Sequence, residues 1–500
     1  MPPSGPASGW GTPRPVYRPR RATQTPLYSV VQHHLETFLA QAAEADTPGE
    51  GVPPWVERDF RGYLECGILA YGFARARCQE CGHERLIPFS CKGRGVCPSC
   101  NARRMCEVAA HLTDHVLPHF PVRQWVLSAP KRLRPYLQHD TRVAGAVLRI
   151  LLRAIRTTLR RASPGAPSGS QLGAVSFFHR FGSSLNVHPH FHVVVLDGVF
   201  SALSEAADLD VSFHEASELS PTSVHQLEAT VQRRVLRLFA RRGLLDEAAT
   251  DDMLTWQGSG GFSVDASVRI EGEDRAGIER LVRYCARPPF ALERLHAIEG
   301  SASLASPESR LLYRFPKPDV NGRTEILLTP LELLERLARF VPPPRVHRHR
   351  YHGVLAPNAT LRSQVVAIGR PERPALEPGA DAASHGLPPE PGPAPASPAR
   401  IRWAVLLARI YQVLPLLCPA CGGEMRILAF LTDPPVVGAI LLHLDLPRRP
   451  PPLSPARAPP QIDFLTDPSD QSPGFDPAEP EPVPEFEFDQ SVPDDLDFEA

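Results

Sequence analysis

The run Asn-Val-His-Pro-His-Phe-His-Val-Val-Val-Leu-Asp-Gly at residues 186–198 constrains the fold more than any other segment of the chain. Its second half is a continuous apolar run, which predicts a buried β-strand. Successive side chains of a strand point to opposite faces, so His188, His190 and His192 share one face of this strand. Three imidazoles on one face beside an apolar run predict a metal site on a rigid sheet. Solvated histidines on a purely structural strand are the alternative.

The segment before this run, residues 172–181, is predicted to be a second strand that forms a hairpin with residues 187–196. In such a hairpin His179 lies across from His190 and His192. Cross-strand neighbours sit ~5 Å apart, which is close enough to share one ion. His179 is therefore the predicted third ligand, and His188 is the alternative.

The predicted elements mix strands and helices without a regular β-α-β rhythm, which is typical of the α+β class with an antiparallel sheet. Helices are expected at residues 30–43, 141–161, 224–241, 275–287 and 331–340. Strands are expected at residues 124–129, 172–181, 187–196, 262–270, 311–315 and 324–328.

Proline-rich segments divide the chain, because 57 prolines in 500 residues are too many for one compact fold. A chain of this length suggests roughly two to four domains. No apolar run reaches the ~18 residues that a membrane span needs, and the N-terminus lacks the apolar stretch of a secretory signal. The predicted division is a disordered N-terminus (1–26), a zinc- and DNA-binding domain (27–122), a larger α+β domain (123–365), a Pro-rich linker (366–400), a small Cys-x-x-Cys module (401–447) and a disordered acidic tail (448–500).

The ten cysteines occur largely in Cys-x-x-Cys pairs, which favours metal binding in a reducing cytoplasm over disulfides. Fifteen residues separate Cys78-x-x-Cys81 from Cys97-x-x-Cys100, a spacing typical of a four-cysteine structural zinc site. Cys91 is a candidate substitute ligand, and His83 is a weaker one. The later pair at residues 418 and 421 forms only half of a site by itself.

The net charge of −1 conceals a division along the chain. Residues 451–500 contain 13 acidic residues and one arginine, so the first 450 residues carry 53 basic against 42 acidic side chains. A basic, Arg-rich body suits a polyanionic partner such as nucleic acid. Ordinary surface charge is the alternative.

The helix predicted at residues 275–287 carries Arg280, Tyr284 and Arg287 along one face. Guanidinium groups beside a phenol favour its ionised form and bind phosphates. A phenolate that attacks a phosphodiester forms a covalent phosphotyrosine, which retains the energy of the broken ester. Rejoining then needs no nucleotide cofactor, and the sequence has no Walker-type Gly-x-x-x-x-Gly-Lys. A partly buried structural tyrosine is the alternative.

Several motifs, in order along residues 30–365, resemble those of the IS91-like transposases. The zinc-binding domain of that family resembles Phe89–Cys100 (FSCKGRGVCPSC) and Arg123–Ser128 (RQWVLS). Its His-hydrophobe-His (HUH) strand resembles Arg180–Gly198, and its nucleophile helix resembles Tyr284–Pro289 (YCARPP). The segment Arg345–Gly353 (RVHRHRYHG) is also similar to one in the family.

The resemblance implies a rolling-circle transposase with an antiparallel HUH nuclease core behind a zinc-binding module. Such enzymes nick single-stranded DNA at transposon ends, become linked to the 5′ end and rejoin the strands. His190 and His192 match the metal-binding pair of the family, which implies Mg²⁺ or Mn²⁺, whereas imidazole ligands alone favour zinc. Tyr284 matches the nucleophile. The expected protein is cytoplasmic and nucleoid-associated, and DNA contacts are expected from Arg94, Arg103, Arg104, Arg348 and Arg350.

One departure from the family pattern concerns the second tyrosine of its founding members. The next tyrosines after Tyr284 are Tyr313 and Tyr351, so the chain resembles a single-tyrosine branch. Two other functions remain open from the residues alone. One is a transposase with a carboxylate triad and no covalent intermediate, and the other is a zinc-dependent DNA-binding regulator without catalysis.

Overall fold

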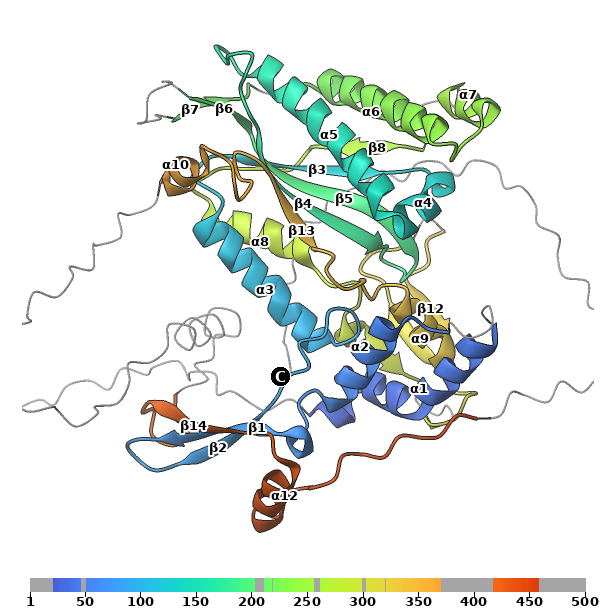
Figure 1. The fold of residues 1–500 in the computed structure, drawn as a ribbon, viewed down its shortest axis with the longest axis vertical. Helices are drawn as coiled ribbons and strands as arrows, with labels where there is room; N and C mark the ends of the chain where they lie inside the picture. Colours follow the sequence, from blue (N-terminus) through green and yellow to red (C-terminus); the bar gives the residue numbers. More distant parts are fainter. Residues whose placement is uncertain are drawn as a thin grey trace, which may run out of the picture.

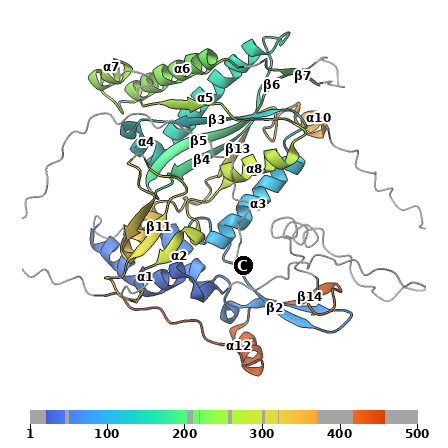
Figure 2. The same ribbon diagram turned by 180° about the vertical axis from the view of Figure 1, so that it is seen from behind.

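The computed structural model describes eight stretches of the chain: residues 21–45, 51–202, 211–217, 219–255, 261–298, 303–319, 321–369 and 417–457. They form three packed parts, drawn in Figure 1 and from behind in Figure 2: a large sheet between helices, a helical part around a small sheet, and a three-stranded ribbon. Helices and antiparallel strands are mixed throughout, which confirms the predicted α+β class.

A six-stranded antiparallel sheet is the centre of the largest part. Its strands run in the order β13-β4-β5-β3-β8, and β9 also pairs with β3. They span Val122–Ser128 (β3), Gly173–Phe181 (β4), Val187–Leu196 (β5), Ser263–Asp265 (β8), Arg269–Ile270 (β9) and His349–Gly353 (β13). The predicted hairpin of β4 and β5 is therefore present. The single strand predicted at 262–270 is instead two short strands that both pair with β3.

Helices cover both faces of this sheet, because alternate side chains of its strands are apolar on each face (Figure 1). Phe191 and Val193 point into a core with α5 and α6, whereas Val194 and Leu196 face α3 and α8. The helices of this part are α3 (Pro98–His115), α4 (Arg134–His139), α5 (Thr141–Ala162), α6 (Pro221–Arg241), α7 (Glu247–Thr255), α8 (Arg275–Ala286) and α10 (Arg362–Ala367). A two-stranded sheet of β6 (Gly198–Ala202) and β7 (Val211–Glu215) extends from the end of β5.

The second part packs three helices around a small antiparallel sheet. The helices are α1 (Pro26–Ala45), α2 (Pro54–Glu65) and α9 (Pro330–Ala338), and the strands are β10 (Leu295–Ala297), β11 (Leu311–Arg314) and β12 (Glu325–Leu328). One apolar core contains residues of all these elements. Because α1 and α2 share this core with residues 290–341, this part draws on both the predicted domain at 27–122 and the predicted domain at 123–365.

The third part is a ribbon with the strand order β14-β1-β2, covered by α12. It consists of β1 (Phe73–Cys78), β2 (Glu84–Pro88), β14 (Met425–Leu431) and α12 (Pro434–His443). The described part of the module predicted at 401–447 is therefore joined to the β1–β2 hairpin, because β14 pairs along the whole of β1. The predicted linker lies mostly outside the described residues.

Residues 448–457 lie along α1, although the sequence predicts that they begin a disordered tail. Ser454 Oγ lies 2.8 Å from His33 Nδ1, and the backbone N–H of Arg457 donates to Thr37 Oγ1 at 3.1 Å. The Arg457 guanidinium lies 3.1 Å from His34 Nδ1 and donates to the Ala305 carbonyl. Polar contacts thus hold the proline-rich segment 448–457 against α1, since the segment has no apolar core of its own. The rest of the predicted tail lies outside the described residues, and so do residues 1–20 of the N-terminus predicted to be disordered (1–26). The prediction is wrong for the end of that segment, because Ala22–Gln24 form a 3₁₀ turn and α1 begins at Pro26.

Within the stretches that the structure describes, none of the helices combines the length and the apolar character that crossing a lipid bilayer requires.

Asp197, directly after β5, forms the best-buried ion pair of the large sheet. Its carboxylate accepts two hydrogen bonds of 2.9 Å from Arg123 and one of 2.8 Å from Arg269, and its side chain is 1% exposed. Replacing Asp197 by Ala leaves the buried Arg123 guanidinium uncompensated, so we expect a loss of about 3–5 kcal/mol in the free energy of unfolding. Urea denaturation followed by circular dichroism measures it. The matched control is Glu325→Ala, which breaks an exposed pair with Arg314 and should cost below ~1 kcal/mol.

Candidate active site and metal centres

Three of the predicted histidines meet on the α8 face of the large sheet. His179 on β4 is directly opposite His190 on β5, and His192 follows on the same face of β5. Ring centroids are 5.1 Å apart for His179 and His190, 4.5 Å for His179 and His192, and 4.9 Å for His190 and His192. All three side chains are buried, and the free ring nitrogens that they offer lie within 4.8 Å of one another.

Backbone carbonyls fix which nitrogen of two rings faces the centre of this group. Nε2–H of His179 donates to the carbonyl of Cys285 at 2.7 Å, and Nδ1–H of His190 donates to the carbonyl of His188 at 2.7 Å. His179 Nδ1 and His192 Nε2 are buried without a hydrogen-bond partner among the described residues. A buried ring nitrogen without a hydrogen-bond partner lowers the stability of the fold unless a ligand binds it. Three neutral ring nitrogens that face a common centre are suited to bind one cation.

Burial keeps these imidazoles neutral, so their lone pairs are available. It lowers the pKa of His179 to about 3, helped by the positive charge of Arg287. The pKa values of His190 and His192 are also well below the usual range, first because of burial and then because of the neighbouring histidines. Neutral imidazole is the form that coordinates a metal. His188, the alternative third ligand, lies outside the group, but its carbonyl orients His190.

Gln124 belongs to the site, although the sequence analysis names it only as part of the motif Arg123–Ser128 and predicts no role for it. It is fully buried on β3, and its side-chain amide lies 2.7 Å from Nδ1 of His192 and 3.4 Å from the Cys285 thiol. The contacting atom is the amide nitrogen, which only donates and so places the His192 proton on Nε2. Turning the amide over brings Oε1, which has no partner among the described residues, against Nδ1 and frees His192 Nε2 for a cation. The available signal was a polar residue directly before the apolar run Trp125–Leu127 of a central strand.

Tyr284 lies beside the histidines on α8, next to the residue whose carbonyl orients His179. Its ring meets that of His192 edge-on, with centroids 5.5 Å apart and planes at 85°. The Arg287 guanidinium lies over the Tyr284 ring at 4.4 Å from its centroid, and its buried Nε has no described partner. Arg280 is exposed one turn earlier, 4.0 Å from the Asp274 carboxylate. Of the two predicted arginines, Arg287 is thus the one whose guanidinium is stacked on the phenol ring.

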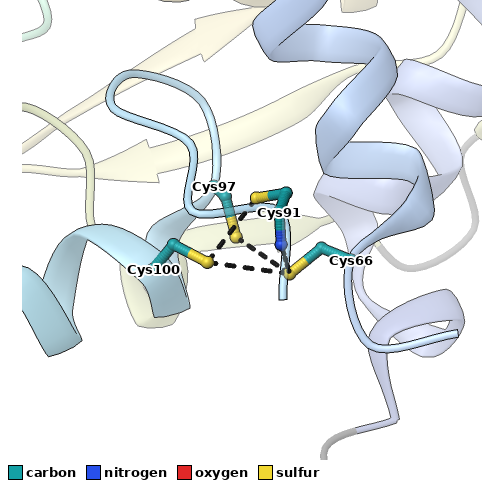
Figure 3. A group of neighbouring side chains, drawn as sticks. All are labelled: Cys66, Cys91, Cys97 and Cys100. Carbon is teal, nitrogen blue, oxygen red and sulfur yellow. Dashed lines mark hydrogen bonds between the residues drawn. The ribbon is translucent and has the colours of Figure 1, made fainter. Parts of the chain in front are cut away.

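Four cysteines converge where the ribbon joins the helical part. Cys66 follows α2, Cys91 follows β2, and Cys97 and Cys100 lie at the start of α3. Figure 3 shows their sulfurs facing one another. Sγ of Cys100 lies 3.5 Å from that of Cys91 and 3.8 Å from that of Cys66, and Sγ of Cys97 lies 3.6 Å from that of Cys66. The thiols are coupled through these contacts, which lower the pKa of Cys100 and raise that of Cys97.

Two further cysteine pairs meet at the far end of the ribbon. Cys78 and Cys81 lie in the β1–β2 turn, and Cys418 and Cys421 come from the segment before β14. The predicted four-cysteine site made of Cys78, Cys81, Cys97 and Cys100 is therefore wrong. The reason is the length of the β1–β2 hairpin. Cys78 and Cys81 lie at its turn, whereas Cys97 and Cys100 lie near its base, and the six residues of β1 at ~3.3 Å each separate the two ends.

Comparisons with known proteins match two separate stretches of the chain. A model described as "Transposase zinc-binding domain" matches residues 30–129, and one described as "Putative transposase" matches residues 173–363. The chain is 21% identical over 384 residues to "Transposase for insertion sequence element IS801" of Pseudomonas savastanoi pv. phaseolicola, which covers 75% of this chain and 84% of that protein. It is 30% identical over 175 residues to "Putative transposase y4qJ" of Sinorhizobium fredii, which covers 34% and 40%. No solved structure matches.

The chain belongs to the IS91-like transposases. The match to residues 173–363 contains His179, His190, His192 and Tyr284, so the histidine group lies inside the transposase region. The match to residues 30–129 contains all of Cys66, Cys91, Cys97 and Cys100. Four thiols in a tetrahedral group are the ligand set of structural zinc. This group, with the predicted substitute ligand Cys91 as a full member, is the candidate zinc site within the stretch that matches the transposase zinc-binding domain.

An arginine cluster of the transposase lies between the zinc site and the histidines. It consists of Arg94, Arg104 and Arg348. Burial lowers the pKa of Arg348 to about 10, with further contributions from the charges of Arg104 and Arg94. The nearby carboxylate of Asp59 is already occupied by three backbone N–H groups at residues 94–96.

The two other predicted DNA contacts are placed differently. Arg103 is paired with Glu107 at 2.7 Å, and Arg350 is exposed on β13. The arginine cluster therefore brings three positive charges together beside the single carboxylate of Asp59.

Proposed function

We propose that this transposase nicks and rejoins single-stranded DNA at insertion-sequence ends through a 5′-phosphotyrosine on Tyr284. The observation that carries the proposal is the Tyr284 ring placed 5.5 Å from His192, beside buried imidazole nitrogens that lack partners. A nucleophile and a cation-binding group in contact are what in-line attack on a phosphodiester requires. The same arrangement supports a rolling-circle mechanism with one tyrosine.

In the forward step the phenolic oxygen of Tyr284 attacks phosphorus, and the bond from phosphorus to the 3′ oxygen breaks. The phenol loses its proton, and the 3′ oxygen gains one and leaves as a free 3′-OH. Arg287, 4.4 Å above the ring, favours the developing phenolate and can bind a phosphate oxygen. In the reverse direction a 3′-OH attacks the phosphotyrosine and releases Tyr284, so the number of phosphoester bonds is conserved.

His179, His190 and His192 are the residues that would hold a divalent cation. Mg²⁺ or Mn²⁺ bound there would polarise a phosphoryl oxygen and stabilise the negative charge that develops on it. The protein's own contribution is to keep the three rings neutral and oriented. The carbonyls of residues 188 and 285 and the Gln124 amide do so.

The arginine cluster is proposed to bind the DNA backbone on its way to Tyr284. Arg348 is close enough to His179 that its charge lowers the pKa of that ring, so the positively charged cluster lies beside the neutral histidine group. Each phosphate neutralised by an arginine releases counterions, with a slope of about −0.7 per contact for a single strand. Single-stranded DNA also leaves the scissile phosphate accessible to a tyrosine on a helix.

Replacing Arg104 by Gln is expected to weaken single-stranded DNA binding and to reduce its salt dependence by about 0.7 in the log–log slope. Folding should not suffer, because the change removes a charge that repels Arg94 and Arg348. Fluorescence anisotropy at several salt concentrations measures both quantities. Arg323→Gln is the control, since Arg323 is exposed and paired with Asp319 in a separate turn. Equal slopes for Arg104→Gln and the control would contradict this role of the cluster.

The function itself is tested with labelled single strands tiled across the DNA that flanks the gene. With Mg²⁺ or Mn²⁺ we expect one oligonucleotide to give a protein–DNA adduct that survives denaturation and a fragment that a polymerase can extend from its 3′-OH. A carboxylate-triad transposase would cut without an adduct. A non-catalytic regulator would bind without cutting.

A further inference from the structure

The cysteine group at the tip of the ribbon lies outside the zinc site assigned above. Cys78 Sγ lies 3.5 Å from Cys421 Sγ, and Cys81 Sγ lies 3.5 Å from Cys418 Sγ. Two of its members, Cys418 and Cys421, are beyond both stretches that match transposase models. The two pairs are more than 330 positions apart in the sequence, so only the fold brings these four thiols together.

The two pairs have the same local backbone structure. In the first turn the N–H of Cys78 donates to the carbonyl of residue 83 at 2.8 Å, and the N–H of Gly82 donates to Cys78 at 3.2 Å. In the second turn the equivalent bonds run from Cys418 to residue 423 at 2.7 Å and from Gly422 to Cys418 at 2.9 Å. Both glycines adopt positive φ angles, 73° and 77°, which other residues rarely adopt. Two matching tight turns that face each other are the usual architecture of a zinc ribbon.

The sulfur spacing fits a tetrahedral metal better than disulfides. Zinc–sulfur bonds of about 2.3 Å place the sulfurs of a tetrahedral site roughly 3.8 Å apart. A disulfide requires about 2.0 Å. The observed contacts of 3.5 Å are near the first value, and all four cysteines are free thiols.

The ribbon has too little apolar core to fold by itself. Under the turns, the buried core consists of Ala76, Cys78, Cys418 and Met425, and a second small cluster joins α12 to Phe73. The outer face of β14 leaves Leu428 and Phe430 more than half exposed. Small modules with such cores usually depend on a metal for folding.

We propose that Cys78, Cys81, Cys418 and Cys421 bind a second structural Zn²⁺ that fastens residues 417–446 to the β1–β2 hairpin. This site joins cysteines 337 to 343 positions apart, so it closes the chain around the whole transposase region. The strand β14 and the helix α12 would then be parts of the zinc-binding domain contributed by the far end of the chain. The proposal does not depend on the phosphotyrosine mechanism.

The test counts zinc atoms per chain by mass spectrometry in protein that carries His190→Ala and His192→Ala, so that the histidine group does not contribute. We expect two zinc atoms in this background and one after adding Cys418→Ser and Cys421→Ser. Cys106→Ala is the control and should retain two, because Cys106 is buried on α3 outside both cysteine groups. Cys421→His should also retain two, since three thiolates and one imidazole form a normal zinc site.

Hydrogen exchange supplies a readout independent of metal counting. Loss of the second zinc is expected to increase exchange of the β14 amides that pair with β1, while the β4 and β5 amides stay protected. One zinc atom in the starting protein, unchanged by the double serine substitution, would overturn the proposal. So would six free thiols instead of ten in the denatured, metal-free protein, because that result would indicate two disulfides.

Discussion

Tyr284→Phe is expected to reduce DNA nicking by about four to six orders of magnitude, as loss of a covalent nucleophile does in other enzymes. The substitution removes one oxygen atom and keeps the ring that packs against His192 and Arg287. The affinity for single-stranded DNA and the free energy of unfolding should therefore remain close to those of the wild type. Denaturing gels of a 5′-labelled and a 3′-labelled strand measure both the adduct and the released fragment.

Tyr351→Phe is the matched control for this substitution. Tyr351 lies on β13, paired with Val175 of β4, so it is on the same sheet but next to different side chains. Its hydroxyl lies 3.3 Å from His349 Nε2, and the Arg362 guanidinium is 5.2 Å from its ring centroid. Burial raises the pKa of Tyr351, so the neutral phenol is the favoured form. An adduct that persists in Tyr284→Phe and disappears in Tyr351→Phe would exchange the two roles and reject the assignment made here.

The sequence was sufficient to predict those parts of the site that depend on neighbouring residues. A strand has a period of two, so the shared face of His190 and His192 follows from the sequence once the strand is recognised. The short connection between residues 181 and 187 makes antiparallel pairing with the preceding strand the simplest arrangement. That pairing places His179 opposite His190, as predicted.

The partners of the cysteines could not be predicted in the same way, because they depend on contacts between distant segments. Cys-x-x-Cys spacing identifies a turn that presents two thiols, but it does not say which other turn completes the site. The β1–β2 hairpin carries Cys78 and Cys81 away from Cys97, and β14 brings Cys418 to them from more than 300 residues away. Gln124 was equally hidden, since its partner His192 lies on the neighbouring strand.

His190→Ala or His192→Ala is expected to stop cleavage at every tested concentration of Mg²⁺ or Mn²⁺. Each change removes a buried lone pair from the shared group and leaves a cavity that water can enter. His179→Ala should weaken cleavage less, and higher metal concentrations should partly restore it, because the β5 pair would still hold the ion. The measurement is the nicking rate as a function of metal concentration for each variant.

His188→Ala is the control that separates ligand loss from loss of a nearby imidazole. The His188 ring meets that of His190 with centroids 5.2 Å apart, but it is not a member of the three-histidine group. Its backbone carbonyl accepts the Nδ1–H of His190, and that carbonyl survives the substitution. We therefore expect His188→Ala to keep nearly the metal dependence of the wild type. If His192→Ala cleaves as well as the wild type, the three histidines do not bind the catalytic ion. If His188→Ala instead fails like His190→Ala while His179→Ala is unaffected, the third ligand is His188, and the β5 strand supplies the whole group.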